Sequence, residues 1–406
     1  MEQKKPGFSA LARGALMPQE SMLEVKKSKH ELFIGIPKET SYQENRIPLV
    51  PHAVSLLVNN GHRVLMETGA GNASSFTDTD YSEAGAQIAY TPEEVYKADM
   101  ILKVAPPSTA ELKLMHDRQT LISILQLSMQ PENYIKQLSG KKITAIAYEH
   151  IEDPTGVFFI IRAMGEIVGS TAILIAAEYL SSVHQGKGEM LGGVPGIPPT
   201  EVVILGAGTV GEYAMRAAMG LGATVKVFDN SLYKLRRLQD MLGQKVFTST
   251  IVPHVLSKAL KTADVAVGAV RATEGRSPCI VTEEMVSEMK AGSVIIDVSI
   301  DQGGCFETSE VTNHTQPIFR KHGVVHYCVP NIASRVPRTA SYALSNIFTP
   351  ILLSIGEEGG MEGMLWADKG VRHGVYLYKG TVTSKYVSEA SGLAYRDLDL
   401  LMAARM

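Results

Sequence analysis

The segment 202–211, Val-Val-Ile-Leu-Gly-Ala-Gly-Thr-Val-Gly, constrains the fold of this chain more than any other feature. It reads as a buried strand, a glycine turn with G-x-G-x-x-G spacing and the start of a helix. Gly206 permits a tight turn, Gly208 lets the backbone approach a pyrophosphate, and Gly211 allows the helix to pack closely on the strand. The pattern therefore predicts a dinucleotide-binding unit.

The residues that follow the glycine turn indicate which dinucleotide is bound. Thr209 and Val210 begin the helix, and the N–H groups at a helix N-terminus favour the negative charge of phosphates. Asp229 follows the next apolar run, 224–228, and its carboxylate would hydrogen-bond a ribose diol and repel a 2′-phosphate. The sequence therefore predicts that the cofactor is NAD rather than NADP.

Composition narrows the class of protein. A chain of 406 residues with 45% hydrophobic content is long enough for two or three domains with buried cores. The net charge of -3 and the lack of long runs of one charge do not favour nucleic acid as a partner. No continuous apolar run reaches the roughly 18 residues of a membrane span, so we expect no membrane insertion.

The cysteines indicate a reducing compartment. Cys279, Cys305 and Cys328 are too few and too scattered for a disulfide framework or a metal site. We therefore expect a cytoplasmic protein with buried thiols and no bound metal.

Alternating short apolar runs and helical segments predict an α/β protein with parallel sheets. We expect two Rossmann-like, doubly wound domains with a substrate cleft between them. The predicted parts are an N-terminal extension (1–31), a discontinuous substrate domain (32–160 and 336–406) and an NAD-binding domain (161–335). In this arrangement the chain leaves the first domain, forms the second, and returns by a helix from about residue 339 to the first.

Several separate segments resemble the family of the alanine dehydrogenases and the NAD-binding part of pyridine nucleotide transhydrogenase. The resemblance extends from about residue 32 to the mid-350s. It implies NAD-dependent, reversible oxidative deamination of L-alanine to pyruvate and ammonium, and a homo-oligomer for which a hexamer is the usual form. The segments that carry it are 35–40, 44–51, 101–104, 192–196 and 297–307.

Carried over position by position, the resemblance assigns three charged residues to the site. Arg46 would bind the substrate carboxylate, and its guanidinium has the two parallel donors that a carboxylate requires. Lys103, at the end of an apolar strand, would lie beside the substrate carbonyl as the catalytic acid/base, with its pKa lowered by partial desolvation. Asp301 would be the catalytic aspartate beside the nicotinamide and the reacting nitrogen.

The same resemblance assigns further cofactor contacts. Val270 and Asn331 occupy positions like those of the family's cofactor-binding loops, and Asp301 would contact the cofactor as well as the substrate. Loops tolerate substitution, so these assignments depend more on the resemblance than on the residues themselves.

One position departs from the family pattern. Gln126 stands where the family has a histidine that contacts the substrate carbonyl, and a glutamine cannot exchange a proton near neutral pH. Either Gln126 only orients the carbonyl oxygen while Lys103 and water carry protons, or the substrate differs. His150 is an alternative proton carrier, although a single histidine after a strand is more often structural.

Two other functions stay open from the sequence. Gln126 is compatible with another amino-acid dehydrogenase or an opine-type, saccharopine-like dehydrogenase on the same scaffold. A non-catalytic, transhydrogenase-like NAD-binding module is the second alternative, and the joint presence of Arg46, Lys103 and Asp301 argues against it.

Overall fold

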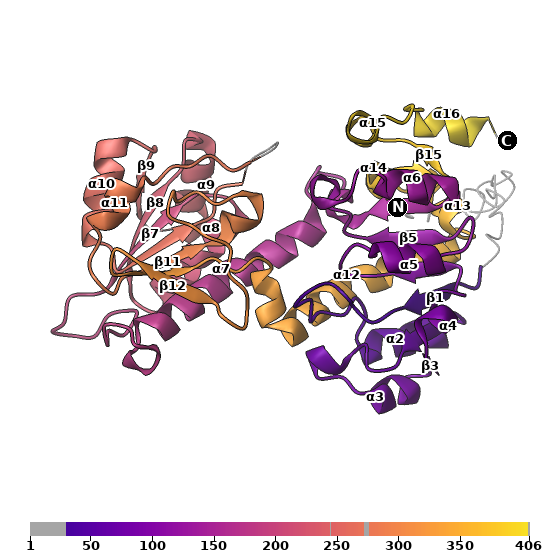
Figure 1. Cartoon of the computed structure of the whole chain (residues 1–406), viewed down its shortest axis with the longest axis horizontal. Helices are drawn as coiled ribbons and strands as arrows, with labels where there is room; N and C mark the ends of the chain where they lie inside the picture. Colours follow the sequence, from indigo (N-terminus) through magenta and orange to yellow (C-terminus); the bar gives the residue numbers. More distant parts are fainter. Residues whose placement is uncertain (1–29, 244, 272–275, 405–406) are drawn as a thin grey trace, which may run out of the picture.

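The computed structural model describes residues 30–243, 245–271 and 276–404. The predicted N-terminal extension lies outside these residues except for its last two positions. Figure 1 shows two lobes, each built on one sheet, that are bridged by the long helices α7 (Phe159–Leu180) and α12 (Pro337–Glu357). The predicted α/β class with two separate sheets is confirmed.

Within the described residues, the first sheet has eight strands in the order β15-β14-β6-β5-β4-β1-β2-β3. Strands β1 to β6 pair in parallel, whereas β14 runs antiparallel to both β6 and β15. The chain therefore returns to its first sheet after forming the second. The bounds are β1 (Phe33–Ile36), β2 (Arg63–Glu67), β3 (Gln87–Ala89), β4 (Met100–Leu102), β5 (Thr120–Ser123), β6 (Thr144–Ala147), β14 (Val375–Tyr378) and β15 (Thr381–Val382).

Over the same described ranges, the second sheet has seven strands in the order β12-β13-β11-β10-β7-β8-β9. All neighbours are parallel except the edge pair β12 and β13. This doubly wound order places the glycine turn after a central strand. The bounds are β7 (Glu201–Leu205), β8 (Thr224–Phe228), β9 (Phe247–Ser249), β10 (Val265–Gly268), β11 (Val294–Asp297), β12 (Ile318–Lys321) and β13 (Val324–Tyr327).

The central strands form because their residues are apolar on both sides. Val202 and Ile204 of β7 belong to one core cluster, and Val203 and Leu205 belong to another. Successive side chains of a strand point to opposite faces, so these two clusters lie on the two faces of the sheet. A continuous apolar run is therefore what a parallel strand covered by helices on both faces requires.

The remaining helices cover the sheets and connect the strands. Several begin at a side-chain cap; α5, for example, has a capping box in which Ser108 and Glu111 each accept from the other's backbone N–H. The bounds are α2 (Pro51–Asn59), α3 (Asp78–Glu83), α4 (Pro92–Val95), α5 (Thr109–Leu114), α6 (Tyr134–Gly140), α8 (Thr209–Gly220), α9 (Leu232–Leu242), α10 (Pro253–Thr262), α11 (Glu283–Ser287), α13 (Met361–Ala367), α14 (Lys369–His373), α15 (Lys385–Ser391) and α16 (Leu398–Ala403).

Helix α7 is long and apolar enough, by length and composition, to cross a membrane. In the fold it packs along α8 instead, and glycine makes the close contact possible. A Cβ at Gly169 would lie 2.3 Å from the carbonyl oxygen of Val210, whereas a Cβ at Gly165 would meet Thr209 at an ordinary 3.5 Å. The apolar character of α7 is therefore explained by its packing between the two domains, as in the core helix of other α/β proteins.

This contact predicts opposite effects for two glycine substitutions in one helix. Gly169→Ala should destabilise the protein by about 1–3 kcal/mol because the helices must move apart. Gly165→Ala, the matched control, should stabilise it by up to about 1 kcal/mol because alanine favours the helix and has room. Urea unfolding of both variants measures the difference, and equal effects would contradict the close crossing at Gly169.

Candidate active site

The glycine turn after β7 has the geometry that a dinucleotide requires. Gly206 has a φ of 106°, and a Cβ there would lie 2.4 Å from the carbonyl oxygen of Ala269. A Cβ at Gly211 would lie 1.9 Å from the carbonyl oxygen of Gly206, so the start of α8 packs directly on the turn. Around Gly208, no heavy atom of the described chain lies within 4 Å of a Cβ position. The turn therefore needs glycine at two positions and leaves open space at the third.

Asp229 fixes this turn to the end of β8. One of its carboxylate oxygens accepts the N–H of Ala207 at 2.7 Å, and the other accepts the N–H of Ser231 at 2.7 Å. Each carboxylate oxygen can accept a second hydrogen bond. Asp229 can therefore hold the turn and bind a ribose hydroxyl at the same time, while Thr209 and Val210 stand at the N-terminus of α8.

Lys103 follows β4 and is fully buried between two carboxylates. Its Nζ lies 2.8 Å from Oε1 of Glu111 and 3.1 Å from Oε2 of Glu39. Burial disfavours the charged ammonium, but the charges of Glu39 and Glu111 outweigh it and raise the pKa of Lys103. The expectation of a lowered pKa was wrong, because the sequence showed the desolvation and not the two partners.

The two carboxylates come from different elements and differ in electrostatic state. Burial raises the pKa of Glu39, although Lys103 opposes this, and its oxygens accept the N–H groups of Val104 and Ala105. In contrast, Lys103 outweighs burial at Glu111 and lowers its pKa. Glu111 thus serves both as the N3 residue of the α5 capping box and as the anionic partner of Lys103.

Arg46 lies in the loop after β1 and is held by a neighbour in the sequence. Its Nε and Nη2 donate to the carboxylate of Glu44 at 2.8 and 2.6 Å, and the side chains are 11% and 4% exposed. Arg46 therefore meets one carboxylate with one edge of its guanidinium. The other edge is formed by Nη1, which lies 3.6 Å from Sδ of Met164, and by the second proton of Nη2.

Glu44 also connects the two domains. Asn331, which follows β13, donates from Nδ2 to Oε2 of Glu44 at 2.9 Å. The neighbouring Gln43 accepts the N–H of His314 at 2.7 Å and donates to Thr315 at 3.1 Å. Burial opposes ionisation of Glu44, but Arg46 outweighs it and lowers the pKa of Glu44. A charged carboxylate thus binds the predicted substrate-binding arginine and a predicted cofactor-binding residue together.

Gln126 begins the loop after β5 in an unusual backbone conformation. It has a φ of 39° and a ψ of 55°, and its N–H donates to Oε1 of Glu149 at 3.0 Å. The N–H of Leu125 donates to the same oxygen at 2.8 Å. The other oxygen of Glu149 is buried without a hydrogen-bond partner among the described residues, and burial raises the pKa of Glu149. Glu149 therefore holds the loop that presents Gln126.

Arg271 connects this loop electrostatically to Asp301. Asp301 lies in the 3-10 turn after β11, where burial of its carboxyl group raises its pKa and the charge of Arg271 opposes the rise. The same charge opposes the raised pKa of Glu149 in the first domain. The carbonyl of Val270, beside Arg271, accepts from Ser299 at 2.7 Å. The contacts of Glu44 and Glu149 with the predicted site residues are not visible in the sequence, whereas Arg271, beside Val270, already resembles a position of the family's cofactor-contacting loops.

His150 is packed as a structural residue. Its ring contacts Phe158 edge-on, with centroids 5.7 Å apart, and Tyr376 at 5.5 Å. Burial lowers its pKa, and the charges of His373 and Arg271 lower it further. This surrounding agrees with the structural interpretation of His150 rather than with a role in proton transfer.

The predicted substrate-binding residues lie in two groups, one around Glu39 and Glu44 and the other around Glu149. The predicted cofactor contacts lie along one edge of the second sheet. The charge of Glu39 raises the pKa of Arg46 as well as that of Lys103, so both cations lie within the electrostatic reach of one carboxylate. Asn331 joins this group through Glu44, and Arg271 relates Asp301 to Glu149. On the second sheet, the predicted cofactor contacts all follow the carboxyl ends of parallel strands, which is where open α/β sheets bind ligands.

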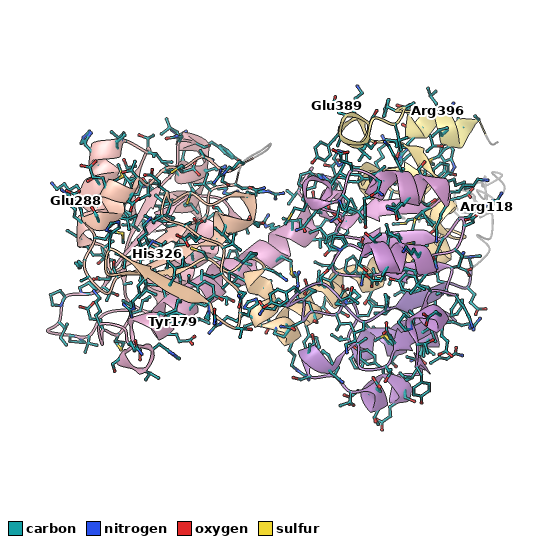
Figure 2. All side chains as sticks on the ribbon, viewed as in Figure 1. Arg118, Tyr179, Glu288, His326, Glu389 and Arg396 are labelled. Atoms are coloured by element: carbon teal, nitrogen blue, oxygen red, sulfur yellow. The ribbon has the colours of Figure 1, made fainter. Side chains whose placement is uncertain are left out.

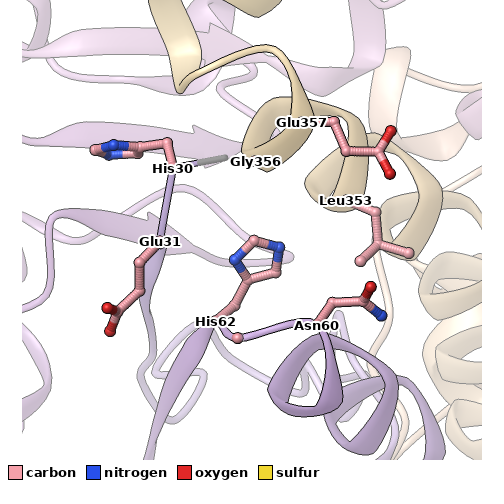
Figure 3. A pocket seen from close by; sticks show the side chains of 8 residues that line it. His30, Glu31, Asn60, His62, Leu353, Gly356 and Glu357 are labelled. Atoms are coloured by element: carbon pink, nitrogen blue, oxygen red, sulfur yellow. The ribbon is translucent and has the colours of Figure 1, made fainter. Parts of the chain in front are cut away.

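The pocket shown in Figure 3 is separate from this site. It has a volume of about 220 Å³ and lies between the start of the first domain and the end of α12. The Nδ1 atom of His62 accepts the N–H of Leu32 at 3.3 Å, which gives this ring a structural role. None of the predicted site residues is among its lining residues, which are His30, Glu31, Asn60, Gly61, His62, Leu353, Gly356 and Glu357.

Models of two known families of domains match most of the chain. The family description "Alanine dehydrogenase/PNT, N-terminal domain" matches residues 35–168, and "Alanine dehydrogenase/PNT, C-terminal domain" matches residues 172–385. Alanine dehydrogenase 2 of Staphylococcus aureus strain USA300 is 39% identical over 367 residues, which cover 90% of this chain and 98% of the relative.

Two solved structures share the fold. An L-alanine dehydrogenase has a TM-score of 0.82 and 38% identity, over 88% of this chain and 98% of its own. A transhydrogenase from Sinorhizobium meliloti has a TM-score of 0.74 at 23% identity, over 87% of this chain and 99% of its own. The second likeness supports the fold alone.

The raised pKa of Glu149 predicts a dependence of stability on pH. An acid whose pKa is higher in the folded protein than in the unfolded chain disfavours folding as the pH rises through both values. Glu149→Gln removes this ionisation, while its amide oxygen can still accept the N–H groups of Leu125 and Gln126. The stability of the variant relative to the wild type should therefore increase between about pH 4 and about pH 7.

Urea unfolding midpoints across this pH range measure the effect. Glu132→Gln, which removes an exposed carboxylate in the loop that follows Gln126, is the matched control for the loss of one charge. A stability difference between Glu149→Gln and the wild type that stays constant with pH would show that Glu149 ionises as easily in the fold as in the unfolded chain.

Proposed function

The chain belongs to the alanine dehydrogenase/PNT family, and on this basis we propose that it catalyses the NAD-dependent, reversible oxidative deamination of L-alanine to pyruvate and ammonium. The observation that carries the proposal is the group formed by Arg46, Lys103 and Asn331. A buried lysine and a largely buried arginine, suited to a carbonyl and a carboxylate, are influenced by the same carboxylate of Glu39, and Glu44 joins Arg46 to the nucleotide-binding domain.

The glycine turn supports NAD as the cofactor. Open space above Gly208 allows a pyrophosphate to approach the N–H groups at the start of α8. Asp229 retains acceptor capacity for a ribose diol, and its carboxylate disfavours a 2′-phosphate. When bound, the nicotinamide ring supplies the acceptor for the hydride that leaves the substrate's α-carbon. Val270, Asp301 and Asn331 are the proposed protein contacts on its side of the cleft.

We assign the substrate contacts to the cations and polar groups of the site. The outer edge of Arg46, where Nη1 makes only a weak hydrogen bond to Sδ of Met164, can bind the substrate carboxylate while Glu44 fixes the opposite edge. Because the pKa of Lys103 is raised, we assign it the role of a charged donor to the carbonyl oxygen, which gives up a proton only when the substrate takes it. We assign to Asp301 the stabilisation of the positive charge of the reacting nitrogen, and to Gln126 the orientation of the carbonyl oxygen.

The assembly and location of the enzyme are part of the same proposal. Leu174 on α7, and Val183 and Met190 in the loop that follows, are apolar and exposed by 59%, 81% and 62%. Such exposed apolar side chains favour burial against a second copy, so we propose a homo-oligomer, with a hexamer as the form that the family suggests. The three cysteines are free, which suits a reducing cytoplasm. Cys305 and Cys328 are buried as expected, whereas the expectation of a buried thiol was wrong for Cys279, which is exposed.

An assay of NAD⁺ reduction over the proteinogenic amino acids tests the proposed reaction. We expect NADH formation with L-alanine and pyruvate-dependent NADH oxidation with ammonium, and little turnover with NADP⁺. The reverse assay with other 2-oxo acids, and with lysine in place of ammonium, tests the opine-type alternative. NAD binding without turnover of any amino or oxo acid would instead favour the non-catalytic module.

Gln126→His separates the two interpretations of the glutamine. If the chemistry is that of the family, a side chain that exchanges protons near neutral pH should raise kcat for L-alanine by about 10-fold or more, because general acid–base catalysis contributes at least that much. Gln126→Asn, which keeps an amide, is the control and should not raise kcat. A wild type that is fast with another substrate and slowed by Gln126→His would show that the glutamine defines a different substrate.

A further inference from the structure

The first sheet has a second charged site at the edge opposite to Gln126 and Glu149. Because β5 and β6 are parallel, their amino ends lie together at one edge, and the two site residues follow their carboxyl ends. At the amino edge lies a pocket of about 450 Å³. It is lined by Arg118, Thr120, Lys142, Thr144, Met361, Glu362, Tyr378 and Lys379.

Positive charge dominates this pocket. Lys379 forms an ion pair with Glu362, whereas the side chains of Arg118 and Lys142 have no hydrogen-bond or ion-pair partner within the part of the chain that the structure describes. Three cations therefore face one carboxylate. Figure 2 shows Arg118 on the side of the first domain that faces away from the second domain, so this charge is remote from the proposed cofactor.

The backbone at these cations has a conformation that side chains disfavour. Arg118, Lys142 and Lys379 have φ values of 65°, 55° and 48°, in the left-handed region where glycine is the usual residue. Arg118 and Lys142 each stand two residues before their strand. A cation at each of these positions thus adds conformational strain that a glycine would avoid.

The same turn before other strands is mostly built with glycine. The residue two positions before a strand also has a positive φ at β2, β3, β8 and β11, where it is Gly61 (88°), Gly85 (91°), Gly222 (90°) and Gly292 (77°), and at β13, where it is His322 (53°). Among the described turns of this type, those before β5, β6 and β15 carry a lysine or an arginine, and all three of these residues line the pocket. Strain retained where glycine would fit indicates a function for the side chains.

We propose that this pocket binds a small anion that carries a phosphate group. The planar guanidinium of Arg118 matches two phosphate oxygens, and Lys142 supplies a second charge for a dianion. Thr120 and Thr144 add hydroxyl groups to the lining, and the volume lies within the usual range for small-molecule pockets. The site is independent of the proposed dehydrogenase reaction, because it lies at the opposite edge of the first sheet.

Thermal unfolding of the full chain, saturated with NADH, tests this site. The dinucleotide fills the glycine turn, so added pyrophosphate reports on other sites only. Pyrophosphate should raise the melting temperature relative to potassium chloride of equal ionic strength. Arg118→Gly combined with Lys142→Gly should fold, because glycine favours these turns, and should bind pyrophosphate about 100-fold more weakly through the loss of two charged contacts.

Matched variants show whether the response to pyrophosphate comes from this pocket. Arg236→Gln combined with Lys258→Gln removes the same charge from exposed positions of the second domain and should keep the full response to pyrophosphate. Glu362→Gln should strengthen the response, because it removes the one carboxylate of the pocket. An equal response in the double glycine variant, or no response of the wild type at millimolar pyrophosphate, would overturn the proposal. A response to citrate without one to pyrophosphate would overturn the choice of phosphate over carboxylate.

Discussion

The carboxylate of Glu44 makes the interaction on which the proposed site depends. It is nearly inaccessible to solvent and accepts two hydrogen bonds from the guanidinium of Arg46, one from the Arg46 backbone N–H, one from Asn331 and a longer one from Ser334. A buried charge is tolerated only when it is paired and hydrogen-bonded, so neither partner can leave without a large cost. The orientation of the arginine and the position of the loop after β13 are therefore fixed by one group. Glu44 therefore fixes the position of the proposed substrate contact in one domain relative to the proposed cofactor contact in the other.

At Lys103, burial and the charges of neighbouring carboxylates have opposite effects on the pKa. Complete burial alone would favour the neutral amine, yet two carboxylates at about 3 Å favour the ammonium more strongly. The raised pKa of Lys103 favours the charged ammonium as the form that meets the substrate. A positive charge suits the polarisation of a carbonyl group, and the ammonium can act as an acid rather than as a base.

The sequence predicted those features that depend on neighbours along the chain. The glycine spacing, the long apolar runs of β7, β10 and β11 and the bridging helices were recognisable because their pattern is local. The strand β14 was missed, although its residues are fully buried, because its burial results from pairing with β6 more than 200 residues earlier. The partners of Lys103 and the link from Glu44 to Asn331 were missed for the same reason. Contacts between distant segments decide the electrostatics of a site, and no local pattern records them.

Residues with a positive φ occur in this chain in two situations. At some positions only glycine fits the backbone, and at others a large polar side chain is present in spite of the strain. At Gly206 a Cβ would collide with the main chain, so the residue is determined by the fold. At Arg118 and Gln126, near the two ends of β5, the conformation is equally unusual but the side chain is large and polar. The strand between them has four residues and spans only about 13 Å, and it is hydrogen-bonded to β4 and β6 along both sides. An anion at the amino end could reach Gln126 only by moving the central strands together, so we expect it to affect the stability of the first domain more than the geometry of the proposed active site.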